Sequence, residues 1–260
     1  MNYKQKWLVQ GAGWLGIPLI RALQQAGYEA HAGSRNAMQF RQHYPDIPVI
    51  GLNPDLKQLP DLEAYDGLIA AFPPGVKQDG PLAYAGRMGR LGSTLATNAR
   101  FVMLSSTGVY ADAAGTYAET DGVKDDHPVR LAETALLETR SGALILRLGG
   151  LTASDRLIGR YFSERELSDP DAPVNFIHRE DAVAACIYLI GQQASGIYNV
   201  VAPEHPTKSE VYSADLAALG LPLFINAEKS KKALARIISS EKLQAAGYAF
   251  LHLNPLKFPR

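Results

Sequence analysis

The stretch Trp7-Leu8-Val9-Gln10-Gly11-Ala12-Gly13-Trp14-Leu15-Gly16 decides the fold of this 260-residue chain. Four residues of strand character lead into a glycine-rich turn, and apolar residues at helical spacing follow up to Ala26. A strand, a Gly-x-Gly-x-x-Gly turn and a helix, in that order, predict a dinucleotide whose pyrophosphate lies at the N-terminus of the helix. The residues expected to bind it are Gly11, Gly13, Trp14, Leu15 and Gly16. The alternative is a glycine-rich turn in an α/β protein that binds nothing.

The second strand, expected over 28–32, bears on which dinucleotide binds. An acidic residue at its end would hold the ribose 2′-hydroxyl of NAD, but Gly33, Ser34 and Arg35 stand there instead. A hydroxyl and a guanidinium suit a 2′-phosphate, because arginine presents a planar fork of donors to phosphate oxygens. The sequence therefore favours NADP(H) over NAD(H), with Ser34 and Arg35 as cofactor-binding residues. The alternative for Arg35 is a solvated loop charge.

Continuous apolar runs in the first 150 residues indicate strands that are buried on both faces. The runs are Gly67–Phe72, Phe101–Leu104 and Ala143–Leu148, and helical patterns lie between them. This alternation predicts an α/β fold: a Rossmann-type, doubly wound parallel sheet with helices on both faces. The pattern becomes irregular beyond residue 150. We expect an NAD(P)-binding domain over 1–150 and a small C-terminal substrate lobe over 151–260, with 174–201 returning to the main sheet.

The ends of these runs supply further candidate cofactor contacts. Ligands of doubly wound sheets bind beyond the carboxyl ends of the strands. Phe72, Pro73 and Pro74 close one run and are expected to line the edge of the cofactor, although a plain strand-to-helix turn would have the same sequence. Ser105 closes another run, and its hydroxyl is expected to face the nicotinamide half of the dinucleotide.

Composition limits the classes of function. Lys and Arg total 26, as do Asp and Glu, so the formal net charge is zero and gives no support to a nucleic-acid or anionic-membrane surface. A small-molecule substrate is the expected partner. The single cysteine, Cys186, excludes a disulfide framework within one chain. No apolar stretch reaches the roughly 18 residues of a membrane span, and no signal-peptide pattern precedes the first strand, so a cytoplasmic protein is the simplest interpretation.

Six motifs, taken together, resemble a known superfamily. In chain order they are GAGWLG (11–16), SSTGVY (105–110), LRLGGL (146–151) followed by Arg156, NFIHREDAV (175–183), GIYNVVAPEHPT (196–207) and ISSEKLQAAGY (238–248). The chain resembles the extended short-chain dehydrogenase/reductase superfamily, the NAD(P)-dependent sugar epimerases and dehydratases. The resemblance runs almost from end to end.

The resemblance implies roles for several residues. Ser106 matches the catalytic Ser or Thr of the family, with Thr107 beside it. His178 and Asp181 match a pair that is mainly structural, Asn199 lies in the strand that supports the substrate lobe, and Arg156 matches an arginine near substrate phosphates. Relatives often pair through a four-helix interface, which implies a monomer or a homodimer with helices 82–98 and 131–139 as candidate contacts.

One departure from the family concerns the proton-transfer couple. The family uses a Tyr followed four residues later by a Lys, about twenty residues after the Val-Tyr pair; the Lys lowers the pKa of the Tyr. The corresponding window, Asp125–Glu133, contains neither Tyr nor Lys. Tyr117 lies upstream, but the fourth residue after it is Asp121.

Two hypotheses about function follow. The first is an atypical oxidoreductase or epimerase-like enzyme that acts on an unidentified carbonyl or alcohol, with sugars and nucleotide sugars as the implied class. Ser106 or Thr107 would polarise the carbonyl, and Tyr110, His127 or Tyr117 would supply the proton; an imidazole titrates near neutrality. Tyr110 could instead pack behind the cofactor, and His127 could be a plain loop histidine. The second hypothesis is a non-catalytic NADP(H)-binding regulatory protein.

The sequence contains no clear motif for metal catalysis or for a serine hydrolase. The six histidines show no H-x-x-x-H or H-x-x-E spacing with a strong ligand context, so no metal site is expected. No G-x-S-x-G elbow is present either, which argues against a serine hydrolase.

Overall fold

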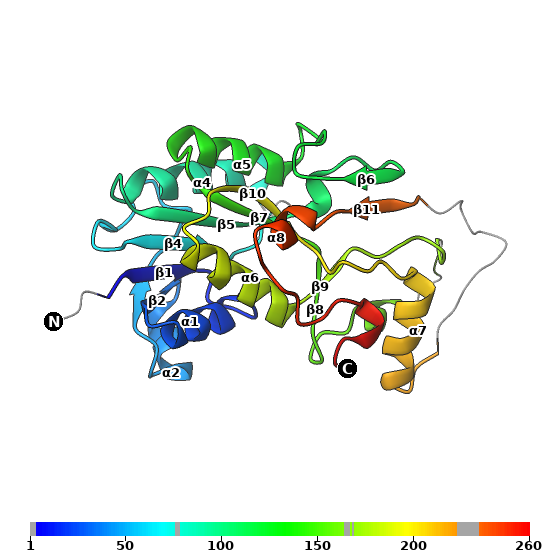
Figure 1. Cartoon of the computed structure of the whole chain (residues 1–260). Helices are drawn as coiled ribbons and strands as arrows, with labels where there is room; N and C mark the ends of the chain where they lie inside the picture. The colour runs from blue at the N-terminus through cyan, green and yellow to red at the C-terminus, as the bar shows by residue number, and fades with distance from the viewer. Residues whose placement is uncertain (1–3, 76–78, 164–166, 168, 223–233) are drawn as a thin grey trace. The chain divides into compact units, whose positions relative to one another are not determined.

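A computed structural model describes residues 4–75, 79–163, 167, 169–222 and 234–260 (Figure 1). The chain divides into two compact units. The first unit contains Met1–Val109, Val123–Arg147 and Cys186–Ile197, and the second contains Tyr110–Gly122, Leu148–Ala185 and Tyr198–Arg260. The segment 110–122 therefore belongs to the second unit. The expected division of labour between a cofactor domain and a substrate lobe stays a prediction.

The central element is a seven-stranded parallel sheet. Its strands in spatial order are β10 (Gly196–Val200), β7 (Leu144–Leu148), β5 (Arg100–Ser106), β4 (Gly67–Ala70), β1 (Lys6–Gln10), β2 (Glu29–Ser34) and β3 (Val49–Gly51). The register pairs Gln10 with Gly33 on one side and with Ala70 on the other, so three carboxyl ends lie level. The predicted doubly wound α/β sheet is confirmed.

Helices cover both faces of this sheet (Figure 1). Helices α4 (Pro81–Thr94) and α5 (Pro128–Thr139) lie together on one face, and α1 (Gly16–Gln25) and α2 (Ala37–His43) lie on the other. A glycine of α4 allows close packing against α5. A Cβ on Gly92 would lie 2.3 Å from Oγ1 of Thr139. Trp7, Leu8 and Val9 of β1 are fully buried between the layers.

The second unit contains short elements. Strand β6 (Gly115–Tyr117) pairs in parallel with β11 (Arg236–Ile238), and β8 (Gly150–Thr152) pairs in parallel with β9 (Phe176–His178). The remaining helices are α6 (Arg179–Gly191), which crosses the boundary between the units, α7 (Lys208–Ala218) and α8 (Glu241–Ala245), with 3₁₀ turns at Thr107–Val109, Ile158–Phe162 and Pro255–Lys257.

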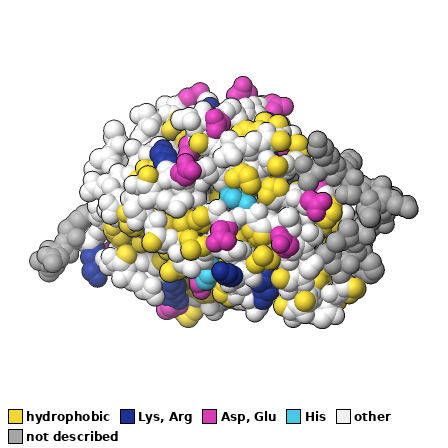
Figure 2. Space-filling view, turned by 45° about the vertical axis from the view of Figure 1, so that its right-hand side comes forward, with side chains coloured by type: hydrophobic (Ala, Val, Ile, Leu, Met, Phe, Trp, Pro, Cys, Tyr) yellow, Lys and Arg dark blue, Asp and Glu magenta, His cyan; other side chains and the backbone are white. Residues whose placement is uncertain are grey.

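The surface carries charged and hydrophobic side chains. On the face drawn in Figure 2, acidic and basic side chains are both present, with hydrophobic side chains between them. Among the residues that the structure describes, no helix is long and apolar enough to cross a membrane.

Candidate functional site

A cavity of about 410 Å³ opens in the first unit at the level carboxyl ends of β1, β2 and β4. Five of the residues predicted from the sequence line it: Gly11, Ser34, Arg35, Phe72 and Pro73. Its position is where a doubly wound sheet binds its ligand. It is therefore the candidate binding site.

The glycine turn beside this cavity has two glycines that the backbone requires. Gly11 has a φ of +93°, and a Cβ there would lie 2.8 Å from the backbone of Ala71 and Phe72. A Cβ on Gly16 would lie 2.3 Å from the carbonyl oxygen of Gly11. Because both positions are glycine, the backbone at the start of α1 can lie close to the backbone at the end of β1.

Gly13 differs from its two neighbours in the motif. A Cβ built on Gly13 meets no atom within 4 Å, and its φ lies outside the left-handed region that favours glycine. Neither the packing nor the conformation of the apoprotein therefore requires a glycine at this position. An approaching ligand would require it, which is the role that the motif assigns to this residue.

The N-terminus of α1 lacks a counter-charge from the chain. Its N-cap, Leu15, forms no side-chain hydrogen bond, and its first turn contains no acidic residue. The N-terminus of a helix carries partial positive charge on its N–H groups. This end of α1 is therefore suited to a phosphate. Trp14 and Leu15 lie in the turn before it, and their contact with a cofactor stays a prediction.

Gln10 is a residue of this cavity that the sequence interpretation missed. Its side chain is 4% exposed, and its Nε2 donates to the carbonyl of Leu52 at 3.3 Å. Its Oε1 is buried without a hydrogen-bond partner in the described part of the chain. Gly33 makes room for it, since a Cβ there would lie 2.2 Å from Oε1. An unpaired buried acceptor at a cavity suits a hydroxyl or amino donor of a ligand. A polar residue ending an apolar strand was the signal in the sequence.

The turn after β2 presents an arginine to the cavity. Oγ of Ser34 accepts from the backbone N–H of Asn36 at 3.2 Å, and Oδ1 of Asn36 caps α2 by accepting from Gln39 at 3.1 Å. Arg35, between these two, is exposed, and it forms no hydrogen bond or ion pair with any other described residue. Its guanidinium is thus available for an anion at the cavity.

A buried arginine supports the opposite wall. Arg87 of α4 donates to Oδ1 of Asp55 at 2.5 Å and to the carbonyl of Pro74 at 3.0 Å, and it also pairs with Asp79. Burial opposes its charge, but the hydrogen bonds to Asp79 and Asp55 raise the pKa of Arg87. Pro74, a predicted cofactor contact, therefore holds the wall in place through its carbonyl, and Pro73 and Phe72 line the cavity itself.

Two of the predicted catalytic residues, Ser106 and His127, both lie near Gly108, just after the end of β5. The backbone N–H of Gly108 donates to Oγ of Ser106 at 3.1 Å. A Cβ on Gly108 would lie 3.3 Å from that Oγ and 3.6 Å from Nε2 of His127. Nδ1 of His127 accepts from the N–H of Val129 at 3.3 Å, so the neutral ring carries its proton on Nε2. Thr107 lies beside them and is buried.

Ser105 is turned toward a buried ion pair. Its Oγ donates to Oε1 of Glu133 at 2.6 Å. Glu133 also accepts two bonds from Arg147, at 3.0 and 2.8 Å, and both side chains are almost fully buried. The Ser105 hydroxyl therefore forms its hydrogen bond inside the protein, with Glu133. Ser105 is not one of the described residues that line the cavity.

Tyr110 lies in the second unit with its hydroxyl engaged. The side chain is fully buried, and the hydroxyl donates to Oδ1 of Asn199 at 2.7 Å. The Tyr117 ring packs against it with centroids 5.6 Å apart, and the Tyr117 hydroxyl donates to the carbonyl of Ala113. These contacts describe a packing role for Tyr110, which is the alternative left open by the sequence.

Helix α5 contains no Tyr and no Lys. Its sequence is PVRLAETALLET, with His127 as N-cap and Pro128 at its first position. The proton-transfer couple of the family is therefore missing from this helix. Ser106, at the end of β5, and His127, the N-cap of α5, are the predicted polar candidates that remain.

Comparisons with known proteins agree with this geometry. No family model matches the chain. The Escherichia coli (strain K12) protein YeeZ is 31% identical over 277 residues, which cover 98% of this chain and 99% of YeeZ.

Two solved structures share the fold. The Bordetella bronchiseptica enzyme WbmG, solved with NAD, is 17% identical with a TM-score of 0.76 over 98% of this chain and 91% of WbmG. WbmG has also been solved with NAD and UDP. The human epimerase family protein SDR39U1, solved with NADPH, is 16% identical with a TM-score of 0.71 over 97% of each chain.

Proposed function

This chain belongs to the family of the Escherichia coli protein YeeZ, and on that premise we propose that it is an extended short-chain dehydrogenase/reductase protein whose first unit binds a nicotinamide dinucleotide. The observation that carries the proposal is the open side of Gly13. It leaves room for a pyrophosphate at the start of α1, beside the cavity at the ends of β1 and β2.

The residues around the cavity fit such a cofactor. Gly11 and Gly13 would hold the pyrophosphate, and Ser34 and Arg35 would hold the 2′-phosphate of NADP(H), which we favour over NAD(H). Gln10 Oε1, which lacks a partner among the described residues, would accept a hydrogen bond from an adenosine hydroxyl or amino group. When bound, the nicotinamide ring supplies the acceptor or donor of a hydride.

The substrate we propose is a sugar or nucleotide-sugar alcohol or carbonyl. WbmG, which shares the fold, has been solved with UDP beside NAD. In this chain Ser106 would donate its hydroxyl hydrogen to the carbonyl oxygen. His127 would donate a second hydrogen bond to that oxygen from Nε2–H, because its Nδ1 accepts from Val129 and the proton of the neutral ring lies on Nε2. Water would supply or take up the transferred proton.

The second candidate function is a non-catalytic NADP(H)-binding regulatory protein. Helix α5 contains neither Tyr nor Lys, which favours this candidate. The Tyr110 hydroxyl donates to Asn199, so its proton is already used in a hydrogen bond within the protein. In that case cofactor binding would be retained without turnover.

Thermal melting with NADPH, NADP⁺, NADH and NAD⁺ in separate samples tests cofactor binding. A ligand that binds only the folded protein stabilises it and so raises the melting midpoint. At a concentration of 100 times its Kd, the free energy of unfolding increases by about 2.7 kcal/mol. We expect the phosphorylated pair to raise the midpoint more than the other pair. The variant Gly13→Val should melt like the wild type without cofactor and lose the shift, because its side chain fills the pyrophosphate space.

Gly191→Ala is the matched control, because its Cβ also meets nothing within 4 Å but lies at the end of α6. It should keep the shift. If no nicotinamide dinucleotide raises the midpoint of the wild type at millimolar concentration, both candidate functions are wrong.

Turnover separates the two candidate functions. If the protein is an enzyme, nicotinamide absorbance should change with some member of a panel of UDP-sugars and aldoses. His127→Gln should then lower kcat by about 10²-fold or more without abolishing the cofactor shift. Cofactor binding with no turnover over the whole panel would favour the regulatory protein.

A further inference from the structure

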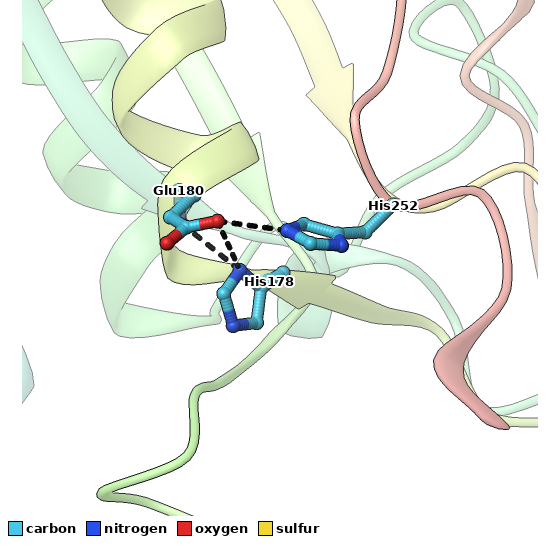
Figure 3. Close-up of side chains that lie close together, drawn as sticks. All are labelled: His178, Glu180 and His252. Carbon is cyan, nitrogen blue, oxygen red and sulfur yellow. Dashed lines mark hydrogen bonds and ion pairs between the residues drawn. The ribbon is translucent and has the colours of Figure 1, made fainter. Parts of the chain in front are cut away.

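Three side chains that can bind a metal ion meet in the second unit, away from the residues used above. His178 ends β9, Glu180 lies in the first turn of α6, and His252 comes from the C-terminal segment (Figure 3). Each offers one ligand atom, and these atoms all lie within 4.8 Å of one another. No assigned role uses this group as a binding site.

The distances between these atoms are close to those of a bound ion. Oε2 of Glu180 lies 2.8 Å from Nε2 of His252 and 3.6 Å from Nδ1 of His178. Zinc bonds to imidazole nitrogen and carboxylate oxygen of roughly 2.0–2.2 Å place tetrahedral ligand atoms about 3.3 Å apart. These two separations lie on either side of that value, and the two imidazole nitrogens lie within 4.8 Å of each other, so movements of the side chains would complete the geometry.

The backbone that carries His252 is fixed by a neighbour of Glu180. The Asp181 carboxylate accepts from the Tyr248 hydroxyl at 2.8 Å, from the N–H of Leu251 at 2.8 Å and from the N–H of His252 at 2.9 Å. Asp181 is fully buried, so these bonds are shielded from water. They hold the C-terminal segment against the start of α6, and they orient a ligand as supporting hydrogen bonds do in metal sites.

The histidine protonation states suit metal binding. Nδ1 of His178 accepts a long hydrogen bond from the N–H of Glu180 at 3.4 Å, so the ring proton resides on Nε2, and an ion bound at Nδ1 would replace this bond. His252 donates from Nε2 to Glu180, and it would offer that nitrogen to an ion by moving its proton to Nδ1. Arg179, the nearest cationic neighbour in the sequence, pairs with Asp155 at 2.9 Å.

Access to the cluster is one-sided. The side chain of His178 is 4% exposed, that of His252 is 18% exposed and that of Glu180 is 62% exposed. An ion could enter past Glu180 and would be backed by the buried His178 ring, which packs against Phe258 with centroids 5.5 Å apart. Three protein ligands leave a fourth position for water.

We propose that His178, Glu180 and His252 bind a divalent transition-metal ion of the zinc type, which joins the C-terminal segment to β9 and α6. Imidazole and carboxylate together suit Zn²⁺ and its neighbours better than Mg²⁺ or Ca²⁺, which prefer all-oxygen sites. The ion adds a second attachment for this segment beside the Asp181 bonds. The proposal does not depend on cofactor binding.

Direct binding to the full-length protein tests the proposal. The protein is treated with a chelator and dialysed, Zn²⁺ is titrated by calorimetry, and bound metal is counted after a second dialysis. We expect one ion per chain and a rise in melting midpoint on adding Zn²⁺. Co²⁺ in its place should give the visible absorption of a tetrahedral nitrogen and oxygen site. Wild-type protein that binds no Zn²⁺ at micromolar concentration overturns the proposal.

Variants identify the site. Glu180→Gln keeps a side chain that can accept from His252 but weakens the metal ligand, and His252→Gln removes an imidazole. Each should lower Zn²⁺ affinity at least tenfold and keep a metal-free midpoint within a few degrees of the wild type. His205→Gln is the matched control, a half-buried histidine of the same unit. Equal affinity in all four proteins would place the ion elsewhere and refute the assignment.

Discussion

At the scale of single residues, an acceptor and a cation line the same cavity. Gln10 Oε1 is buried and, among described residues, has no partner, while Arg35 is exposed on the same cavity. An acceptor suits a hydroxyl or amino group and a guanidinium suits a phosphate. In the proposed complex the two residues would contact different parts of one adenosine.

Replacing Arg35 tests the preference for the 2′-phosphate. Arg35→Ala should weaken NADPH binding roughly tenfold or more, because a hydrogen bond to a charged group contributes about 1.5–3 kcal/mol. NADH binding should stay unchanged. Calorimetric titration with both cofactors measures the difference, and Arg41→Ala, on exposed α2, is the control. An equal loss of affinity for NADPH and NADH would show that Arg35 does not contact the 2′-phosphate.

At the scale of elements, α5 is bound to the sheet by one buried carboxylate. Glu133 joins this helix to Ser105 of β5 and to Arg147 of β7. Breaking a buried ion pair by removing one partner leaves the other charge uncompensated. The place of α5 on the sheet therefore depends strongly on this residue.

Glu133→Ala should lower the free energy of unfolding by about 3–5 kcal/mol. Urea unfolding measures the loss, and Glu138→Ala, on the exposed side of the same helix, should change little. Replacing both partners by Met, as Glu133→Met with Arg147→Met, should recover much of the stability. A single variant as stable as the wild type would contradict this account.

The elements that could be predicted from sequence are those with local signals. The turn from Gly11 to Gly16 and the apolar run of β4 carry their periodicity and their glycines within a few residues. The boundaries were less secure: α4 ends at Thr94, before the predicted residue 98, and α5 begins at Pro128, before the predicted residue 131. A proline at the first helical position explains the earlier start of α5.

Other elements could not be predicted because their signal is distant in the chain. Strands β6, β8 and β11 have three residues each, and β6 finds its partner more than 110 residues later. Strand β6 lies in a segment, 111–128, whose Asp, Gly and Thr residues are typical of a loop. Likewise Glu180 and His252 meet only through the fold, so no local spacing could indicate the cluster with His178.

At the scale of the whole molecule, each unit contains a histidine whose pKa is lowered in the folded protein. Burial and then Lys6 lower the pKa of His31 in the first unit, against the opposing effect of Glu29. Burial lowers the pKa of His205 in the second, against a backbone bond to Val174. In the unfolded chain both titrate near the ordinary value of about 6.5.

The unfolding free energy should therefore fall as pH decreases. Both histidines bind protons more readily when unfolded, so their contribution is fully present above about pH 6.5 and is lost as pH falls through their lower native values. His31→Gln with His205→Gln should flatten this part of the pH profile. Urea unfolding at a series of pH values measures it, with His43→Gln, on exposed α2, as the control. An unchanged slope in the double variant would disprove the prediction.

The strand order has a consequence for how the chain is made. Strand β7 ends at Leu148, and β10, which pairs with it at the edge of the sheet, begins at Gly196. At a synthesis rate of about 5–20 residues per second, the ribosome needs several seconds to deliver that missing neighbour. During this interval β7 is an apolar strand with an unpaired edge, the kind of surface that recruits chaperones or other nascent chains. Slow codons between 148 and 196 would lengthen this exposure, and fast ones would shorten it.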